Sequence, residues 1–350
     1  MFFISDNASA AAPEVMAALA AANDGHAMPY GADALTAHVR NRIRTLFEAP
    51  EAAVYLVATG TGANALALGL MCPPFATVFC HHKAHIAVDE CGAGEFYTAG
   101  AKLVPTGEAD GKISPEALAR TIAEIAHPDV HHLRPGMLSL TNLTEQGTVY
   151  TPAEVAALTD VAKARGLPSH MDGARFANAL VATGATPAEM TWKSGIDVLS
   201  FGGTKNGLMG AEAVVIFDPA KALEFELRRM RGGHLFSKHR YLAAQMAAYL
   251  EDDLWLRLAR NANAMGQRLA AAIAAAPGGR LDPQPAANLM FAALPRATHR
   301  KVRQAGAAYY MMSDDSLTEG ADDTPLTARF VASWSTTEAE VDRFAELIRG

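Results

Sequence analysis

The sequence predicts an α/β fold in two parts: a large domain built on a mostly parallel sheet, and a smaller α/β domain at the C-terminus. Two observations lead to this prediction. Short apolar runs alternate with helical patterns through most of the chain, which is typical of a parallel sheet covered by helices on both faces. After about residue 230 a long helical stretch replaces the alternation. The 350 residues, 50% of them hydrophobic, supply enough apolar material for two cores.

The strands of the large domain are predicted from short apolar runs that end in small or polar turns. The first, AAVYLVATG, is followed directly by a helical pattern at 61–71. The six predicted strands are 52–60, 76–80, 101–106, 136–142, 167–174 and 196–203.

Two helices of the large domain carry clear N-terminal signals. The segment 114–126 begins with Ser114 as its cap residue. The segment 151–166 has Thr151 as its cap and Glu154 three residues later, which is the spacing of a capping box. Both patterns predict helices that cover the sheet.

The smaller domain is predicted from the change of pattern near residue 230. It comprises, in order, a long helical stretch at 237–275, strands at 288–294 and 328–334, and a final helix from Thr337. We therefore divide the chain into an N-terminal arm and large domain at 1–235 and a small domain at 236–350.

Charge and cysteine content argue against several classes of protein. A formal net charge of −7 disfavours nucleic-acid binding. No apolar run approaches the ~20 residues that a membrane-spanning helix needs. Asp6 and Asn7 interrupt the apolar N-terminus and no positive residue precedes it, so no signal peptide is expected. Three cysteines without CxxC spacing are typical of a reduced protein, and we expect a cytoplasmic location.

Three turns that follow predicted strands contain residues suited to chemistry, because ligands of parallel sheets bind outside the carboxyl ends of the strands. The first is ATGTGANAL at 58–66. Backbone N–H groups of Gly60, Thr61 and Gly62, at the start of a helix, favour an anion such as phosphate. The turn lacks a Walker lysine and does not match GxGxxG, so an ordinary strand–helix turn explains it equally well.

The second turn, HMDGARFANAL, holds Asp172 and Arg175. A carboxylate at this place is either a plain helix cap or the partner of a ligand's ring nitrogen. The third turn, SFGGTKNG, holds Lys205 among glycines. A lone lysine is usually a surface residue whose stem covers apolar neighbours.

Together the three turns indicate a pyridoxal phosphate site. The cofactor requires an amine for a Schiff base, an acid that keeps the pyridine nitrogen protonated, and a cradle for the phosphate. Lys205, Asp172 and the turn at 58–66 supply these groups. The glycines around Lys205 are predicted to let the cofactor approach the backbone.

Longer motifs extend this interpretation over nearly the whole chain. They are SDN (5–7), YGAD (30–33), TGTGAN (59–64), HHKAHIAVDECGA (81–93), LTEQGTVYT (143–151), HMDGARFANA (170–179), SFGGTKNG (200–207) and RFVASWST (329–336). In this order they resemble the threonine aldolases, pyridoxal phosphate lyases of the aspartate aminotransferase fold (fold type I), a family shared with phenylserine aldolases and β-eliminating lyases. SFGGTKNG departs from the commoner aldolase form, in which an SKGLGAP-like run follows the lysine, and looks like another bacterial branch.

The resemblance implies a seven-stranded, mostly parallel sheet and assigns cofactor contacts. Lys205 is the Schiff-base lysine, and Asp172 pairs with the pyridine nitrogen. Gly60 and Thr61 bind the phosphate. Thr204 adds a further contact beside the lysine.

The same resemblance implies the groups that face an amino-acid substrate. His85 stacks on the cofactor ring near the substrate hydroxyl, where His85 or a water held by it is the base. Arg175 and Arg329 face the α-carboxylate and a cofactor oxygen, helped by Ser5. Tyr30 lines the site from a neighbouring subunit.

A homo-oligomer follows from these assignments, with a tetramer built as a dimer of dimers as the state that the resemblance implies. The stretch RRMRGGHLFSKHR (228–240) resembles the segment that sends basic residues to the partner's phosphate. The residues concerned are Arg229, Arg231 and Lys238.

The reaction that the resemblance implies is retro-aldol cleavage of L-β-hydroxy-α-amino acids (L-threonine, L-allo-threonine and L-phenylserine) to glycine and an aldehyde. β-Elimination, transamination and a phenylserine-preferring aldolase remain open, as does a catalytically silent binding protein. A metal site at 81–90, with His81, His82, His85, Asp89 and Glu90 as ligands, lacks the HExxH spacing, and no metal is expected.

Overall fold

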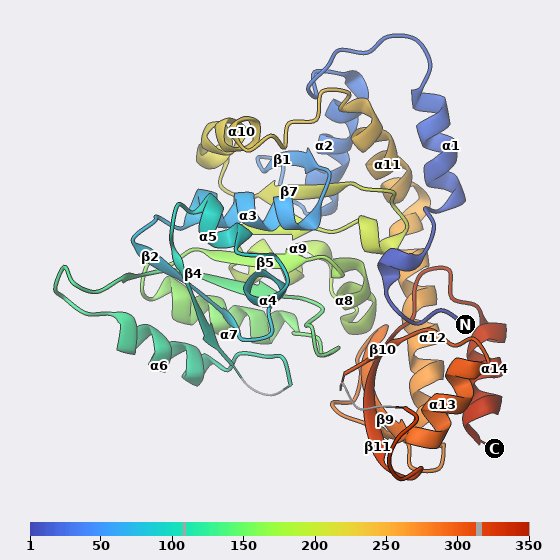
Figure 1. The fold of residues 1–350 in the computed structure, drawn as a ribbon. Coiled ribbons are helices and arrows are strands. Elements are labelled where there is room, and N and C mark those ends of the chain that lie inside the picture. The colour runs from blue at the N-terminus through green and yellow to red at the C-terminus, as the bar shows by residue number, and fades with distance from the viewer. Residues whose placement is uncertain (108–109, 313–316, 350) are drawn as a thin grey trace.

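The computed structural model describes residues 1–107, 110–312 and 317–349. These residues form two β-sheets with separate hydrophobic cores, and Figure 1 shows both chain termini beside the smaller sheet. The predicted α/β class is confirmed. In the described part of the chain the larger sheet has seven strands, most of them parallel.

The strands of the larger sheet lie in the order β1–β7–β6–β5–β4–β2–β3. Their bounds are Ala53–Val57 (β1), Ala76–His81 (β2), Lys102–Thr106 (β3), Arg134–Thr141 (β4), Ser169–Gly173 (β5), Val198–Phe201 (β6) and Glu212–Ile216 (β7). β7, which the sequence patterns did not predict, runs antiparallel to both neighbours. The connection from β6 to β7 contains only the Lys205 turn and no crossover helix, and strands joined in this way pair antiparallel.

Helices cover both faces of this sheet because successive strand residues point to opposite sides. On β1, Val54 and Leu56 belong to one core, whereas Tyr55 and Val57 belong to another on the opposite face. The first core includes residues of α2 (Ala34–Leu46), α6 (Pro115–Ile125), α7 (Pro152–Lys163), α8 (Phe176–Thr183) and α11 (Arg240–Leu250). The opposite face packs against α3 (Gly60–Met71) and α10 (Ala222–Arg231). The remaining helices of this part are α1 (Pro13–Ala22), α4 (His85–Val88), α5 (Ala93–Tyr97) and α9 (Pro187–Met190).

The predicted helix caps are present. The Ser114 hydroxyl accepts a hydrogen bond from the Ala117 N–H at 3.2 Å. Thr151 and Glu154 form the reciprocal bonds of a capping box. Since these bonds satisfy N–H groups that the helix itself leaves free, the two helices begin where the sequence signals place them.

The smaller sheet is antiparallel, in the order β10–β11–β9–β8. Its strands are β8 (Arg280–Leu281), β9 (Leu289–Pro295), β10 (Tyr310–Met311) and β11 (Pro325–Val331), and it packs with α12 (Leu254–Ala274), α13 (Arg296–Gln304) and α14 (Glu338–Arg349). β11 begins three residues earlier than the run predicted at 328–334.

Two segments pack away from the sequence part to which they were assigned. Phe3, at the start of the chain, is buried in the smaller core, with its ring centroid 5.5 Å from that of Phe344. α11 packs in the larger core although it follows residue 236. Each of the two cores therefore contains residues from before and after position 235. The predicted domain boundary at 235/236 stays a prediction.

The helical stretch predicted at 237–275 is two helices rather than one. A short 3₁₀ segment at Glu251–Asp253 separates α11 from α12, and Asp252 and Asp253 have positive φ angles of 45° and 52°. Aspartate is among the few residues that tolerate this region. The break lets α11 cover the larger sheet while α12 reaches the smaller one. None of the helices in the described ranges has the length and apolar character needed to cross a membrane.

Candidate active site

The candidate site begins at Asp172, near the carboxyl end of β5. Its side chain is 3% exposed. One oxygen accepts the Ala174 N–H at 2.9 Å, and the other accepts the amide N–H of Asn64 on α3 at 2.9 Å. The carboxylate therefore closes the turn after β5 and also joins this strand to the helix that begins at the Gly60 turn.

Asn64 extends this contact to the predicted histidine. The Asn64 amide nitrogen also donates to Glu90 Oε1 at 2.9 Å, and the same oxygen lies 2.8 Å from His85 Nδ1. This hydrogen bond to Glu90 raises the pKa of His85. When Nδ1 carries the proton that Glu90 accepts, the other ring nitrogen of His85 is free to accept one.

Lys205 lies in a single 3₁₀ turn, Thr204–Asn206, after β6. Burial, and Arg175 after it, lower the pKa of its amine, whereas Asp6, Asp172 and Glu212 act in the opposite direction. Burial also raises the pKa of Glu212 to about 7. A buried amine with a lowered pKa is deprotonated more easily than a surface lysine, which makes it a better nucleophile.

The glycines before Lys205 pack closely against the protein's own backbone. A Cβ on Gly202 would lie 2.5 Å from the Ala174 carbonyl oxygen, and one on Gly203 would lie 2.8 Å from the Ala211 oxygen. Close packing of the protein's own backbone thus requires both glycines. Their predicted role in letting a cofactor approach the backbone stays a prediction, and Gly202 lines the inner pocket described below. At Gly60, by contrast, no atom outside its neighbouring residues and the backbone of its own helix lies within 4 Å of the position of the missing Cβ.

Five of the predicted residues line one small pocket, which we call the inner pocket. They are Gly60, Thr61, His85, Asp172 and Lys205, and the pocket is completed by Ala63, Asn64, Glu90, Ala174, Ser200, Gly202 and Glu212. These residues come from the ends of β5 and β6, from the first residue of β7, from the start of α3 and from the segment around α4. The inner pocket measures about 40 Å³.

A wider cavity of about 810 Å³, the outer cleft, shares His85 and Lys205 with the inner pocket. The predicted residues Ser5, Arg175 and Arg329 also line it. The two cavities together therefore bring the cofactor-side and substrate-side predictions into one region between the two sheets.

Arg175 has a partner that the sequence patterns did not reveal. Its Nε and Nη2 donate to the two carboxylate oxygens of Asp6 at 2.8 and 2.6 Å. The Asn288 amide nitrogen donates to Asp6 as well, at 3.0 Å. Burial opposes ionisation of Asp6, but Arg175 prevails and lowers its pKa. The pair fixes Arg175 at the floor of the outer cleft and ties the N-terminal arm to both parts of the protein.

Arg329 is held more loosely. Its Nη2 donates to the Ile4 carbonyl at 3.2 Å, and its guanidinium carbon lies 4.9 Å from the centre of the Tyr310 ring. Nε is buried and has no hydrogen-bond partner among the described residues. Burial lowers the pKa of this guanidinium. Of the two arginines, Arg329 is therefore the one whose Nε is buried without a partner among the described residues, whereas Nε of Arg175 donates to Asp6.

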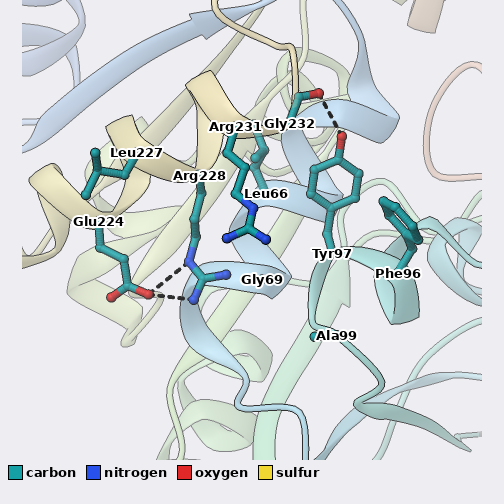
Figure 2. Close-up of a pocket in the computed structure, with 10 residues that line it drawn as sticks. All are labelled: Leu66, Gly69, Phe96, Tyr97, Ala99, Glu224, Leu227, Arg228, Arg231 and Gly232. Carbon is teal, nitrogen blue, oxygen red and sulfur yellow. Dashed lines mark hydrogen bonds and ion pairs between the residues drawn. The ribbon is translucent and has the colours of Figure 1, made fainter.

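Other predicted residues lie outside both cavities. Thr204 adjoins Lys205, and its buried hydroxyl lies near the Glu212 carboxyl group, whose ionised form it favours. Tyr30 is 53% exposed, and Lys238 is exposed as well. Arg229 is buried in its own chain, where its guanidinium lies over the Tyr55 ring and donates to the Leu56 carbonyl. Arg231 lines a separate groove between α3, α5 and α10 (Figure 2).

The histidines considered as metal ligands have other contacts. His81 Nδ1 accepts the Lys83 N–H at 3.0 Å, and His85 bonds to Glu90 as described. Within the described residues, the one group of three side chains close enough to share a metal ion is His127, Asp129 and His132, on the loop before β4. None of these three lines the inner pocket or the outer cleft.

Comparison with known proteins identifies the family. Residues 3–294 match the beta-eliminating lyase family. This chain belongs to that family. The threonine aldolase resemblance is confirmed by relatives of full length: low-specificity L-threonine aldolases of a Pseudomonas species and of Pseudomonas aeruginosa are each 41% identical over 99% of this chain and 96% of their own.

A solved structure also supports the similarity of this member of the beta-eliminating lyase family to the threonine aldolases. A threonine aldolase from Leishmania major superposes with a TM-score of 0.91 at 28% identity, over 99% of this chain and 98% of that chain. The fold-type-I architecture inferred from the motifs is therefore confirmed along the whole length.

Several residues of the site had no catalytic or binding role predicted from the sequence. They are Asp6, Asn64, Glu90, Glu145 and Glu212. Four of them stand inside quoted motifs, namely SDN, TGTGAN, HHKAHIAVDECGA and LTEQGTVYT, so the motifs contained a signal for them. Asp6, Asn64 and Glu145 meet partners that lie 169, 108 and 60 positions away, which is why the motifs alone did not define a function for these side chains.

The packing at Gly202 generates a direct test. Gly202→Ala places a methyl group against the Ala174 backbone, which cannot move as a flexible side chain could. We expect a loss of stability of about 1–3 kcal/mol, measured by denaturant unfolding of the cofactor-free protein. Gly210→Ala is the matched control, since its Cβ would meet its nearest neighbour at an ordinary 3.5 Å. Equal stabilities of the two variants would contradict the packing explanation.

Proposed function

We propose that this protein is a pyridoxal phosphate-dependent lyase that cleaves L-β-hydroxy-α-amino acids to glycine and an aldehyde. L-Threonine, L-allo-threonine and L-phenylserine are its proposed substrates. The observation that carries the proposal is the meeting of Lys205, Asp172 and His85 at one pocket, in a chain 41% identical to low-specificity L-threonine aldolases.

The residues of the inner pocket fit pyridoxal phosphate. Gly60 and Thr61 stand at the start of α3, where backbone N–H groups have no acceptor within the helix, and the space beside Gly60 is open. Asp172 supplies a buried carboxylate for the ring nitrogen, and Lys205 supplies the amine. Because the inner pocket is small, a cofactor held at Asp172 would also extend into the outer cleft.

When bound, the cofactor would accept the electron pair released as the Cα–Cβ bond of the substrate breaks. His85 acts on the other side of this bond. Its ring is oriented by Glu90, and its raised pKa favours removal of the proton from the β-hydroxyl group. The proton then resides on the ring nitrogen that faces away from Glu90.

Arg329 is the proposed anchor for the substrate α-carboxylate. A guanidinium can grip a carboxylate with two parallel hydrogen bonds, and Nε of Arg329 is a donor without a partner in the described residues. Arg175 is held by Asp6, so its proposed contribution is the positive charge at the cleft floor. Ser5, which also lines the cleft, assists this anchoring.

Product analysis tests the reaction class. With L-threonine or L-phenylserine as substrate, we expect glycine and the matching aldehyde in equal amounts, because the residues described act on the β-hydroxyl and α-carboxylate groups. A β-eliminating lyase would instead release ammonia and an oxo acid, and a silent binding protein would release nothing. Either of these last two results would refute the proposed reaction.

Labelling tests the cofactor assignment. Borohydride reduction of the loaded protein followed by peptide mapping is expected to place the cofactor on Lys205, the buried amine of the inner pocket. Lys205→Ala should remove the cofactor's protein-bound absorbance and nearly all turnover. Lys83, which lines the outer cleft, is the matched control. A label on Lys83 rather than Lys205 would overturn the assignment.

Kinetics of Arg329→Lys test the anchor. A lysine offers a point charge on a flexible stem and cannot form two parallel bonds. We expect KM to rise by about tenfold, which corresponds to one lost charge-assisted hydrogen bond, with a smaller fall in kcat. Steady-state assays with L-threonine and L-phenylserine measure both constants. An unchanged KM for both substrates would return Arg329 to a structural role.

A homo-oligomer is the proposed assembly, and a tetramer is the state that the threonine aldolase resemblance implies. Apolar side chains of α5 and α10 are exposed, among them Phe96 (80%) and Leu227 (62%). Both line the groove of about 620 Å³ shown in Figure 2, together with Arg228 and Arg231. Exposed apolar patches of this kind mark protein–protein contacts, and we assign this one to a second copy of the chain.

Sedimentation tests the assembly. Leu227→Glu puts a charge into the proposed contact and is expected to shift the protein to a smaller species at assay concentration. Val130→Glu is the control, because Val130 is apolar and 88% exposed but lies on the loop before β4. A wild-type protein that is active and strictly monomeric would exclude the oligomer, and with it the proposed contributions of Tyr30, Arg231 and Lys238 to a neighbouring site. Arg229, whose side chain is buried against Tyr55 and Leu56 of its own chain, is not among them.

A further inference from the structure

Glu145 is a buried carboxyl group of the outer cleft that none of the steps above uses. It lies on the loop 142–150 between β4 and α7, and this loop is tightly bound. The Asn142 backbone N–H donates to the Asp172 carbonyl at 2.9 Å, and the Asn142 side chain exchanges two hydrogen bonds of 3.1 Å with the Tyr150 backbone. The position of Glu145 is therefore fixed by the fold.

The two oxygens of Glu145 have different surroundings. Oε1 accepts the backbone N–H of His85 at 2.7 Å. His85 is the first residue of α4, and the residue before it, Ala84, has no side chain that can cap the helix. Glu145 takes the place of this cap from a distant loop. Oε2 is buried and makes no hydrogen bond of normal geometry within the described residues. The Thr141 hydroxyl lies close enough to the carboxyl group to favour its ionised form.

Burying a carboxylate oxygen without a hydrogen-bond partner costs free energy, so the ionised form of Glu145 is destabilised in the protein without substrate. Burial, and Asp172 after it, raise the pKa of Glu145 to about 7. A hydrogen-bond donor at Oε2 would favour the ionised form and oppose this shift. The titratable and charged groups that interact with Glu145 are Cys80 on β2, His85 on α4, Tyr150 on its own loop, Asp172 on β5 and Arg175 before α8.

The cleft indicates which donor would reach this oxygen. Glu145 lines it together with His85, Lys205, Arg175 and Arg329. Arg175 and Arg329 are cations and suit the substrate α-carboxylate. Glu145 instead lies beside His85, the residue proposed to act on the β-hydroxyl group. A substrate hydroxyl that faces His85 thus lies on the side of the cleft that Glu145 occupies.

We propose that Glu145 recognises the substrate β-hydroxyl group: Oε1 fixes His85 through its backbone, and Oε2 accepts the hydrogen bond of the hydroxyl when the amino acid binds. Rotation about the C–O bond then turns the single hydroxyl proton from Oε2 to His85, which removes it. This assignment rests on the proposed function and names the residue that selects β-hydroxy amino acids over those without the hydroxyl. When such an amino acid binds, its hydroxyl supplies the hydrogen bond that Oε2 of Glu145 otherwise lacks. An amino acid without a β-hydroxyl leaves Oε2 unpartnered.

Binding of L-serine and L-alanine tests this assignment, because the two differ only in the β-hydroxyl group. Titration calorimetry of the loaded wild-type protein is expected to show L-serine bound about tenfold more tightly, which is the typical value of a hydrogen bond to a charged group. In Glu145→Gln an N–H donor replaces the acceptor at Oε2, and we expect the ratio to fall below about threefold.

Two further variants separate recognition from folding. Glu145→Asp keeps the charge but is too short to reach His85 and the hydroxyl together, so it should lose the same ratio. Asp89→Asn removes an exposed carboxylate that also lines the cleft and should keep it. Unfolding temperature and cofactor absorbance show that each variant is folded and loaded. An unchanged serine-to-alanine ratio in folded Glu145→Gln and Glu145→Asp would overturn the proposal.

The outcome also distinguishes this inference from the proposed function. A wild-type protein that binds both amino acids with the expected ratio, while the Glu145 variants keep that ratio, contradicts only the role of Glu145. A wild-type protein that binds neither amino acid overturns the proposed function, and the role of Glu145 falls with it.

Discussion

The hydrogen bonds of Asp172 are the interaction on which the rest of the candidate site depends. Its two oxygens are held by the Ala174 N–H and by the Asn64 amide. Asn64 also bonds to Glu90, and Glu90 bonds to His85. One chain of contacts therefore joins the end of β5, the start of α3 and the beginning of α4. Because each of these side chains is oriented by the next, the acid, the anion-binding turn and the histidine keep one relative arrangement.

Backbone packing brings the lysine to the same place. Gly202 lets the turn after β6 approach Ala174 so closely that no side chain fits between them. The turn that holds Asp172 and the turn that holds Lys205 are thus pressed against each other. The pair of Asp6 and Arg175 adds the N-terminal arm, and Asn288 links Asp6 to the smaller domain's side of the cleft. The site is consequently assembled from segments that span most of the chain.

The sequence predicted the residues at strand ends well, because parallel strands bring their carboxyl ends to one edge of the sheet. Gly60, Asp172 and Lys205 follow directly from that rule, and the inner pocket contains all three. Contacts between distant segments could not be predicted in the same way. Arg175 meets Asp6 across 169 positions, and Glu145 meets His85 across 60. No local pattern encodes either pair.

Other differences have local causes. Regular apolar spacing continues through 237–275, but Asp252 and Asp253 adopt positive φ angles and divide the segment into two helices. The glycines near Lys205 indicated an unusual turn, and the structure adds that Gly202 and Gly203 also lie against the protein's own backbone. In both cases the residue types indicated an unusual backbone conformation. The contacts with residues distant in sequence showed which packing that conformation permits.

Turnover of Asp172→Asn tests the central claim most directly. Asparagine keeps the size of the side chain and the acceptor for the Ala174 N–H, but it replaces the negative charge that the ring nitrogen of the cofactor requires. We expect the variant to fold, with an unfolding temperature of the cofactor-free form lowered by the loss of the Asn64 hydrogen bond to the second oxygen. We also expect it to bind pyridoxal phosphate weakly and to cleave L-threonine at least a hundredfold more slowly, on the order of one lost electrostatic contact to the reacting group. Full activity in that variant would show that Asp172 only caps the turn after β5, and would contradict the account.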